Sequence, residues 1–130
     1  MRVALAHGLR GQILAQARAA YPGECCGLLT GVRDGDVARI LALYPARNLA
    51  RDDDRFQVDP ADHIAAQKHA RTQGHMVLGC YHSHPNGLAQ PSATDLAGAG
   101  EPGFLWLIAA GDTLNAFVYG RGAFTGVDWL

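Results

Sequence analysis

Hydrophobic residues recur along this chain with two spacings, one typical of helices and one typical of buried strands. From Leu9 to Tyr21 they return every four positions, which predicts an amphipathic helix over residues 7–20. An Asp-Pro pair, the residue types favoured at an N-cap and at the first helical position, predicts a second helix over residues 59–73. A short third helix is expected over residues 92–99.

Short apolar runs bounded by turn residues predict strands in most of the remaining chain. An Asp-Gly pair at residues 34–35 is a hairpin signal between the first two of them. The expected strands cover residues 26–32, 37–44, 56–58, 76–82, 104–110 and 114–119, and the last ten residues are expected to add an edge strand. Because strands outnumber helices and several are joined by tight turns, the predicted fold class is α+β, with helices packed on a sheet.

Length and composition narrow the class of protein. The 130 residues should form one domain, 1–130, with its own buried core. A net charge of -1 argues against a nucleic-acid partner, because nucleic-acid binders usually carry a basic face. The longest purely apolar run, residues 104–110, is too short to span a bilayer, and the N-terminus lacks the apolar stretch of a signal peptide. We therefore expect a cytoplasmic protein with no membrane partner.

The cysteines and one charged run have ordinary interpretations. Cys25, Cys26 and Cys80 are an odd number without a Cys-x-x-Cys pair, so they are expected to be buried and reduced. A nucleophilic role for Cys25 or Cys26 stays open. The charged run over residues 51–55 is expected to be solvated surface, or else the rim of a substrate groove.

Two histidines, a serine and an aspartate within fourteen residues carry the chemistry of the chain. His82 and His84 are two residues apart at the end of a predicted strand, so their imidazoles point to the same side. Asp95, in the first turn of the next helix, can reach back toward them. Two nitrogens and one carboxylate oxygen are the ligand set of a catalytic zinc whose fourth position stays open to water. Ser92 and Asp95 also fit a helix capping box, which is the ordinary alternative.

A hydrolytic metal site also needs a general base, and glutamate is the usual choice. The chain has only two glutamates, Glu24 and Glu101. Glu101 lies in a Gly-Glu-Pro-Gly sequence typical of an exposed turn. Glu24 opens an apolar strand, where a carboxylate is costly unless it is paired or used. Glu24 is therefore the favoured base.

Three segments together resemble the JAMM (MPN+, JAB1/MPN/Mov34) zinc metalloprotease family, in its small stand-alone prokaryotic form. They are Glu24 within YPGECCGLLTG, the two histidines within GCYHSHP, and Ser92 and Asp95 within PSATD. The family pattern is Glu, then His-x-His, seven residues, Ser, two residues, Asp, and this chain has the same spacing. The resemblance implies one MPN domain, a cytidine-deaminase-like three-layer fold with a mixed, mostly antiparallel sheet. Cys80 departs from the pattern, because many members carry an aromatic residue there.

The resemblance also implies a role for each site residue. His82, His84 and Asp95 would bind one zinc ion, with water as the fourth ligand. Glu24 would take a proton from the zinc-bound water and pass it to the leaving amine, and Ser92 would donate a hydrogen bond to the oxyanion. The implied activity is hydrolysis of peptide or isopeptide bonds at the C-terminus of ubiquitin-like or sulfur-carrier proteins.

Other functions are left open by the residues themselves. The chain could be a non-catalytic scaffold of the MPN fold, or resemble the RadC-type DNA-repair-associated branch, whose His-x-His-Pro and Pro-Ser-x-x-Asp elements are similar. The signatures of nucleobase deaminases and of His-Glu-x-x-His peptidases are absent. A homo-oligomer is also possible on the sequence alone. The remaining histidines are expected to be ordinary surface or boundary residues, namely His7, His63, His69 and His75.

Overall fold

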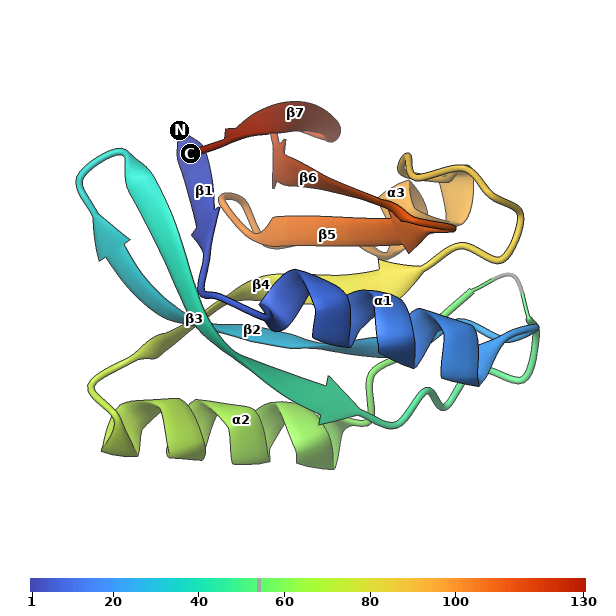
Figure 1. Ribbon diagram of the computed structural model, residues 1–130, viewed down its shortest axis with the longest axis horizontal. Helices are drawn as coiled ribbons and strands as arrows, with labels where there is room; N and C mark the ends of the chain where they lie inside the picture. The colour runs from blue at the N-terminus through green and yellow to red at the C-terminus, as the bar shows by residue number, and fades with distance from the viewer. Residues whose placement is uncertain (54) are drawn as a thin grey trace.

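The computed structural model describes residues 1–53 and 55–130, so Asp54 of the charged run lies outside the described residues. Within them the chain forms three helices and seven strands (Figure 1). The strands are β1 (Arg2–Leu5), β2 (Cys26–Asp34), β3 (Val37–Ala46), β4 (Met76–Ser83), β5 (Leu105–Ala110), β6 (Thr113–Gly120) and β7 (Ala123–Trp129). The helices are α1 (Leu9–Ala20), α2 (Pro60–Thr72) and α3 (Ala93–Gly98).

The strands form one sheet in the order β1-β3-β2-β4-β5-β6-β7, which curls so that β1 also pairs with β7. Three neighbouring pairs are parallel, namely β1 with β3, β1 with β7, and β4 with β5. The other four pairs are antiparallel. The predicted fold class, α+β with a mixed and mostly antiparallel sheet, is therefore confirmed.

The helices cover opposite faces of the sheet, which gives three layers (Figure 1). Successive side chains of a strand point to opposite faces. Leu29 of β2 belongs to the core beneath α1, where Ile13 is fully buried. Its neighbour Leu28 belongs to the second core, together with Ala66 of α2. None of the helices within residues 1–53 and 55–130 is long and apolar enough to cross a membrane.

Three expectations about strands need correction. Residues 2–5 form β1, which the sequence analysis did not predict because four residues give no clear period. The strand expected over residues 56–58 is wrong: only an isolated bridge joins Val58 to Asn48. The final strand is not an edge strand, because β7 pairs with β6 on one side and with β1 on the other.

The register between β2 and β4 brings the candidate site residues to one end of the sheet. These strands are antiparallel, with Cys26 opposite His82. The ladder continues beyond β2 through Ser83, whose main-chain N–H donates to the carbonyl oxygen of Cys25. Glu24, just before β2, therefore lies beside the two histidines at and just after the end of β4, although it is 58 positions from His82 in the chain.

Candidate metal centre

The two histidines of the His-x-His element point to the same side of β4 and meet at their Nε2 atoms. The Nε2 atoms of His82 and His84 are 2.9 Å apart. His82 is fully buried and His84 is nearly so. His84 lies one residue beyond the end of β4, and the alternation of the strand carries over to it, so the two imidazoles share a side as expected.

Asp95 closes the triangle from helix α3. Its Oδ1 lies 3.1 Å from Nε2 of His82, and its Oδ2 lies 3.1 Å from Nε2 of His84. The same carboxylate accepts a hydrogen bond from the main-chain N–H of Ser92, while the Ser92 hydroxyl accepts one from the N–H of Asp95. These two bonds form a capping box. The cap and the histidine contacts therefore coexist, and the cap holds Asp95 in place.

A main-chain carbonyl orients His84. The His84 Nδ1 lies 2.8 Å from the carbonyl oxygen of Leu88, which can only accept a hydrogen. In the neutral imidazole Nδ1 therefore carries the proton, and Nε2 keeps its lone pair for the site. The side chain of Asn86 accepts from the N–H of Leu88 and shapes this loop.

Aromatic rings enclose His82. The ring of Phe56 stacks on the imidazole with centroids 4.2 Å apart, and Trp106 meets it edge-on at 5.7 Å. The buried Nδ1 of His82 has no hydrogen-bond partner among the described residues, so Nε2 is the nitrogen that engages the site. This enclosure restricts the His82 ring to one orientation.

Glu24 approaches the histidines from the other strand. It is buried, and it offers a carboxylate oxygen within 4.8 Å of ligand atoms of His82 and His84. Its neighbour Cys25 is held by Ser83, whose side-chain oxygen accepts from the Cys25 N–H at 2.9 Å. Glu101, the other glutamate of the chain, is exposed near the end of α3. Of the two glutamates, Glu24 is therefore the one that lies beside the histidines.

The donor set fits one small divalent cation. A tetrahedral zinc ion with bonds of about 2.0–2.1 Å separates its ligand atoms by about 3.3 Å. Here the two imidazole nitrogens and the Asp95 oxygens lie 2.9–3.1 Å apart and are buried. So many lone pairs converging in a buried space are ordinarily satisfied by a cation.

The ionisation of these groups follows from burial and from their mutual contacts. Burial lowers the pKa of His82, more than its contact with Asp95 raises it. Burial also opposes charge on His84, but its bonds to Asp95 and to the Leu88 carbonyl outweigh this and raise its pKa. Burial alone would raise the pKa of Asp95, whereas the two histidines hold it well below its usual range. Asp95 is therefore a carboxylate at neutral pH.

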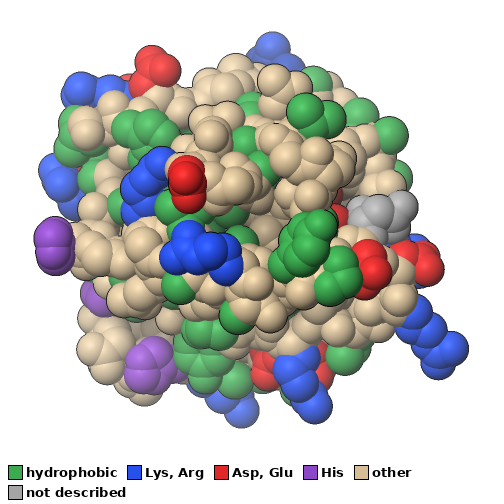
Figure 2. Space-filling view, turned by 45° about the vertical axis from the view of Figure 1, so that its right-hand side comes forward, with side chains coloured by type: hydrophobic (Ala, Val, Ile, Leu, Met, Phe, Trp, Pro, Cys, Tyr) green, Lys and Arg blue, Asp and Glu red, His purple; other side chains and the backbone are tan. Residues whose placement is uncertain are grey.

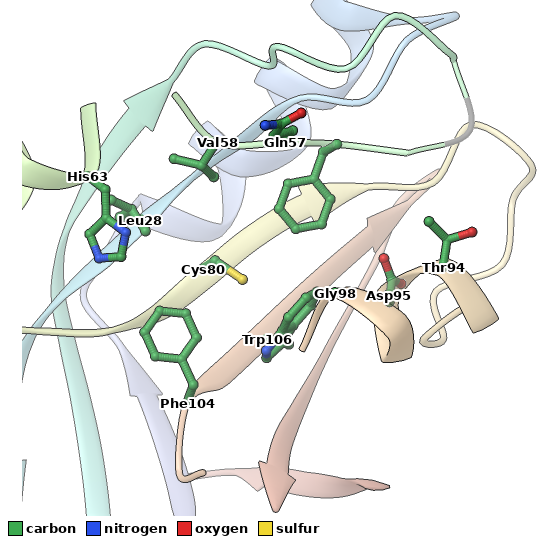
Figure 3. A pocket seen from close by; sticks show the side chains of 11 residues that line it. Leu28, Gln57, Val58, His63, Cys80, Thr94, Asp95, Gly98, Phe104 and Trp106 are labelled. Atoms are coloured by element: carbon green, nitrogen blue, oxygen red, sulfur yellow. The ribbon is translucent and has the colours of Figure 1, made fainter. Parts of the chain in front are cut away.

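A pocket of about 320 Å³ adjoins Asp95 on the α2 side of the sheet, and we call it the Asp95 pocket. Figure 3 shows Thr94 and Asp95 at one end of it, His63 at the other, and Cys80 and Trp106 between them. The wall is mostly aromatic and aliphatic, so the pocket suits an apolar side chain beside the site. His63 and Cys80, which were expected to have only ordinary roles, thus line it.

The cysteines are poor nucleophiles here. All three are free thiols, and burial raises the pKa of each, that of Cys26 to about 12. Because the thiolate is the reactive form, these thiols are unreactive near neutral pH. The possibility that Cys25 or Cys26 acts as nucleophile is therefore disfavoured.

Three residues that support the site were missed by the sequence analysis. Asn48 donates through its side-chain amide to the carbonyl of Glu24 at 3.0 Å, and its Oδ1 accepts from two main-chain N–H groups of the following loop. Phe56 and the carbonyl of Leu88 contact the histidines as described above. Asn48 in a polar loop and Phe56 in a short expected strand carry no local sequence signal of these contacts.

The chain belongs to the prokaryotic JAB family. The family model described as prokaryotic homologs of the JAB domain matches residues 7–120, most of the chain. The resemblance inferred from the sequence, to the small prokaryotic form of the JAMM/MPN+ family, is thereby confirmed.

Three relatives illustrate the similarity. A desampylase of Haloferax volcanii is 34% identical over 116 residues, covering 85% of this chain and 82% of that protein. A CysO-cysteine peptidase of Mycobacterium tuberculosis is 30% identical over 90 residues, covering 69% of this chain and 60% of that protein. The solution structure of a protein from Desulfitobacterium hafniense superposes with a TM-score of 0.90 at 33% identity, covering 98% of this chain and 91% of the other.

Proposed function

We propose that residues 1–130 form one metallopeptidase domain that hydrolyses peptide or isopeptide bonds at the C-terminus of ubiquitin-like or sulfur-carrier proteins. One observation carries the proposal: two Nε2 atoms and a carboxylate meet within 3.1 Å, with Glu24 beside them. The names of the desampylase and CysO-cysteine peptidase relatives support the substrate class.

His82, His84 and Asp95 would hold one zinc ion. Bound there, zinc would supply a Lewis acid that polarises a carbonyl group and makes water acidic near neutral pH. The protein contributes the fixed orientation of the ligands. The Leu88 carbonyl keeps the Nε2 lone pair of His84 available, and the capping box holds Asp95.

Glu24 would be the general base and then the general acid. Its carboxylate would take a proton from the attacking water and deliver that proton to the departing amine nitrogen as the C–N bond breaks. Its burial next to the histidines supports this role, because a buried carboxylate responds strongly to neighbouring charge.

Ser92 would stabilise the oxyanion that forms during attack. The hydroxyl accepts the bond from the Asp95 N–H through a lone pair, which leaves its hydrogen for a substrate oxygen. A donor aimed at this position typically contributes about 3–4 kcal/mol to stabilisation of the transition state.

Two alternative functions have less support. A non-catalytic MPN scaffold has no need of the full set of five residues, all of which are present here. A RadC-like protein that binds DNA would be expected to carry a basic face. On the described part of the face in Figure 2, basic and acidic side chains are interspersed.

The proposal is tested with purified protein and a small ubiquitin-like carrier fused at its C-terminus to a reporter. Zinc-loaded protein should cleave after the carrier's last glycine, as read by mass, and a chelator should stop the cleavage. A protein that binds zinc but cleaves no such fusion would be a scaffold, and salt-sensitive DNA binding would instead favour the RadC-like role.

A further inference from the structure

One loop joins the two segments that supply the proposed metal ligands. It covers residues 85–91, and we call it the connecting loop. It begins directly after His84 and ends directly before Ser92, the N-cap of α3. A displacement of the connecting loop would therefore change the position of His84 relative to Asp95, which lies in the first turn of α3.

Short-range hydrogen bonds hold the first half of the connecting loop. The main-chain N–H of Gly87 donates to the carbonyl of His84, and the N–H of Leu88 donates to the side chain of Asn86. The carbonyl of Leu88 in turn accepts the hydrogen on Nδ1 of His84. These three bonds fold the loop back onto His84, but they do not tie it to the rest of the sheet.

The side chain of Asn115 on β6 provides that tie. Its amide donates to the main-chain carbonyl of Ala89 at 3.0 Å, across 26 positions of the chain. Ala89 is buried, whereas its neighbours Leu88 and Gln90 are exposed. Asn115 therefore contacts the connecting loop at a buried point, one residue after the carbonyl that orients His84.

The register of the sheet relates Asn115 to the other histidine. Asn115 pairs with Ile108 of β5, and Ile108 pairs with His82 of β4. Paired residues of neighbouring strands point to the same face of a sheet, so Asn115 lies in the same row as His82, two strands or roughly 10 Å away. The sheet that carries His82 thus also holds, through Asn115, the loop that orients His84.

We propose that Asn115 is a positioning residue of the metal centre, which holds the Leu88 carbonyl against His84 through its bond to Ala89. The inference rests on the metal-binding part of the proposed function. Without the amide donor the buried carbonyl of Ala89 would be unpaired, and the loop would shift to bring it to water. The Leu88 carbonyl would move with it, because the two residues are adjacent.

The predicted consequence is weaker metal binding. Loss of the partner that orients a metal-ligating histidine typically weakens metal binding roughly 10- to 100-fold. Asn115 acts on that partner through one further residue, so we expect the lower end of this range, about tenfold. Asn115 itself is a positioning residue and would contact neither the metal nor the substrate.

The test compares Asn115→Leu with the parent and with Val118→Ala. Leucine has a size similar to that of asparagine but carries no donor, and Asn115→Ala removes the same donor without adding an apolar branch. Val118, on the same strand, points to the opposite face and packs against the core beneath α1. Val118→Ala should therefore lower the urea midpoint without disturbing the connecting loop. It is the matched control for general destabilisation.

Two readouts that do not depend on turnover are measured on each protein. The first is the dissociation constant for zinc, by competition with a chelating dye. It should rise about tenfold in both Asn115 variants and stay at the parent value in Val118→Ala. The second is the Nδ1–H proton resonance of His84 in the zinc-loaded protein, which the Leu88 carbonyl protects from exchange with water. It should be present in the parent and in Val118→Ala, and broadened or absent in the Asn115 variants.

The inference and the proposed function fail in different ways. If an Asn115 variant kept the parent's zinc affinity and His84 resonance, the positioning role would be overturned and the metal site would stand. An equal loss of zinc affinity in Val118→Ala would assign the effect to general destabilisation and would also overturn it. A parent protein that binds no zinc would contradict the proposed function itself.

Discussion

The side-chain amide of Asn48 donates a 3.0 Å hydrogen bond to the main-chain carbonyl of Glu24 and a second, at 3.2 Å, to the carbonyl of Arg55. Its Oδ1 accepts from the N–H groups of Ala50 and Gln57, both at 2.9 Å. One side chain thus ties the proposed base to the loop whose Phe56 covers His82.

Replacing Asn48 should therefore damage both the loop and the base. In Asn48→Ala four bonds are lost, and we expect about 2–3 kcal/mol lower unfolding free energy by urea denaturation, together with reduced kcat. Asn48→Asp keeps the acceptor for the two loop N–H groups but loses the donor to Glu24. It should recover part of the stability while kcat stays low. Full activity in Asn48→Asp would show that the bond to Glu24 is not needed to position the base.

The features that the sequence predicted are those encoded by residues close together in the chain, and the features that it missed depend on contacts between distant segments. His82, His84, Ser92 and Asp95 fall within fourteen consecutive residues, so a strand period and a capping pattern were enough to bring them together. The helices over residues 9–20 and 60–72 were likewise predicted from local period and caps.

The missed features depend on distant parts of the chain. Residues 2–5 are a strand only because β3 and β7 flank them. Residues 56–58 pair with residues 47–49 only through an isolated bridge, in which the N–H of Leu49 donates to the carbonyl of Gln57. The Asn48 side chain accepts from the N–H of Gln57 and adds to this contact. The pairing of Asn48 with Glu24 spans 24 residues of chain and depends on the β2–β3 hairpin register.

Glu24→Gln tests the base directly. The amide has nearly the same size as the carboxylate but cannot accept a proton, so turnover of a carrier fusion should fall below detection. Zinc content, measured by atomic absorption, and the unfolding temperature should stay near those of the parent. Cleavage at the parent rate would remove Glu24 from the mechanism.

Ser92→Ala should separate two roles of one hydroxyl. Loss of the helix cap should lower stability by about 1 kcal/mol, and loss of the oxyanion donor should lower kcat by roughly a few hundredfold. Ser92→Thr keeps both the acceptor and the hydrogen, and should restore most of both quantities. If Ser92→Ala loses stability but not kcat, the serine is only a cap.

Zinc should stabilise the fold, and the effect should depend on pH. Ligand at about 100 times its Kd adds about 2.7 kcal/mol to the unfolding free energy, so Tm should rise with zinc in the parent and not in His84→Ala.

Protons compete with zinc for the Nε2 atoms, and the raised pKa of His84 makes this competition begin at a higher pH than for an ordinary histidine. The zinc-induced rise in Tm should therefore shrink from pH 7.5 to pH 6, as followed by scanning calorimetry. A rise that is independent of pH would exclude histidine ligation.

Gly79 sets the spacing between β4, which carries the histidines, and β5. It pairs with Leu29 on one side and Leu105 on the other, and a Cβ added to it would lie 2.1 Å from the Leu105 carbonyl oxygen. That contact is with main chain, so a side chain cannot simply rotate away. Gly79→Ala should cost about 3 kcal/mol in urea denaturation and, by displacing β4, weaken zinc binding at His82.

Gly126→Ala in β7 is the matched control for this substitution. A Cβ there meets nothing within 4 Å, so its effect on the unfolding free energy should stay within about 0.5 kcal/mol. If Gly79→Ala were as stable as Gly126→Ala and bound zinc equally well, the backbone of β5 would have to yield without moving the histidines. The position of His82 would then depend on the Phe56 and Trp106 rings that enclose it, and not on the β4–β5 spacing.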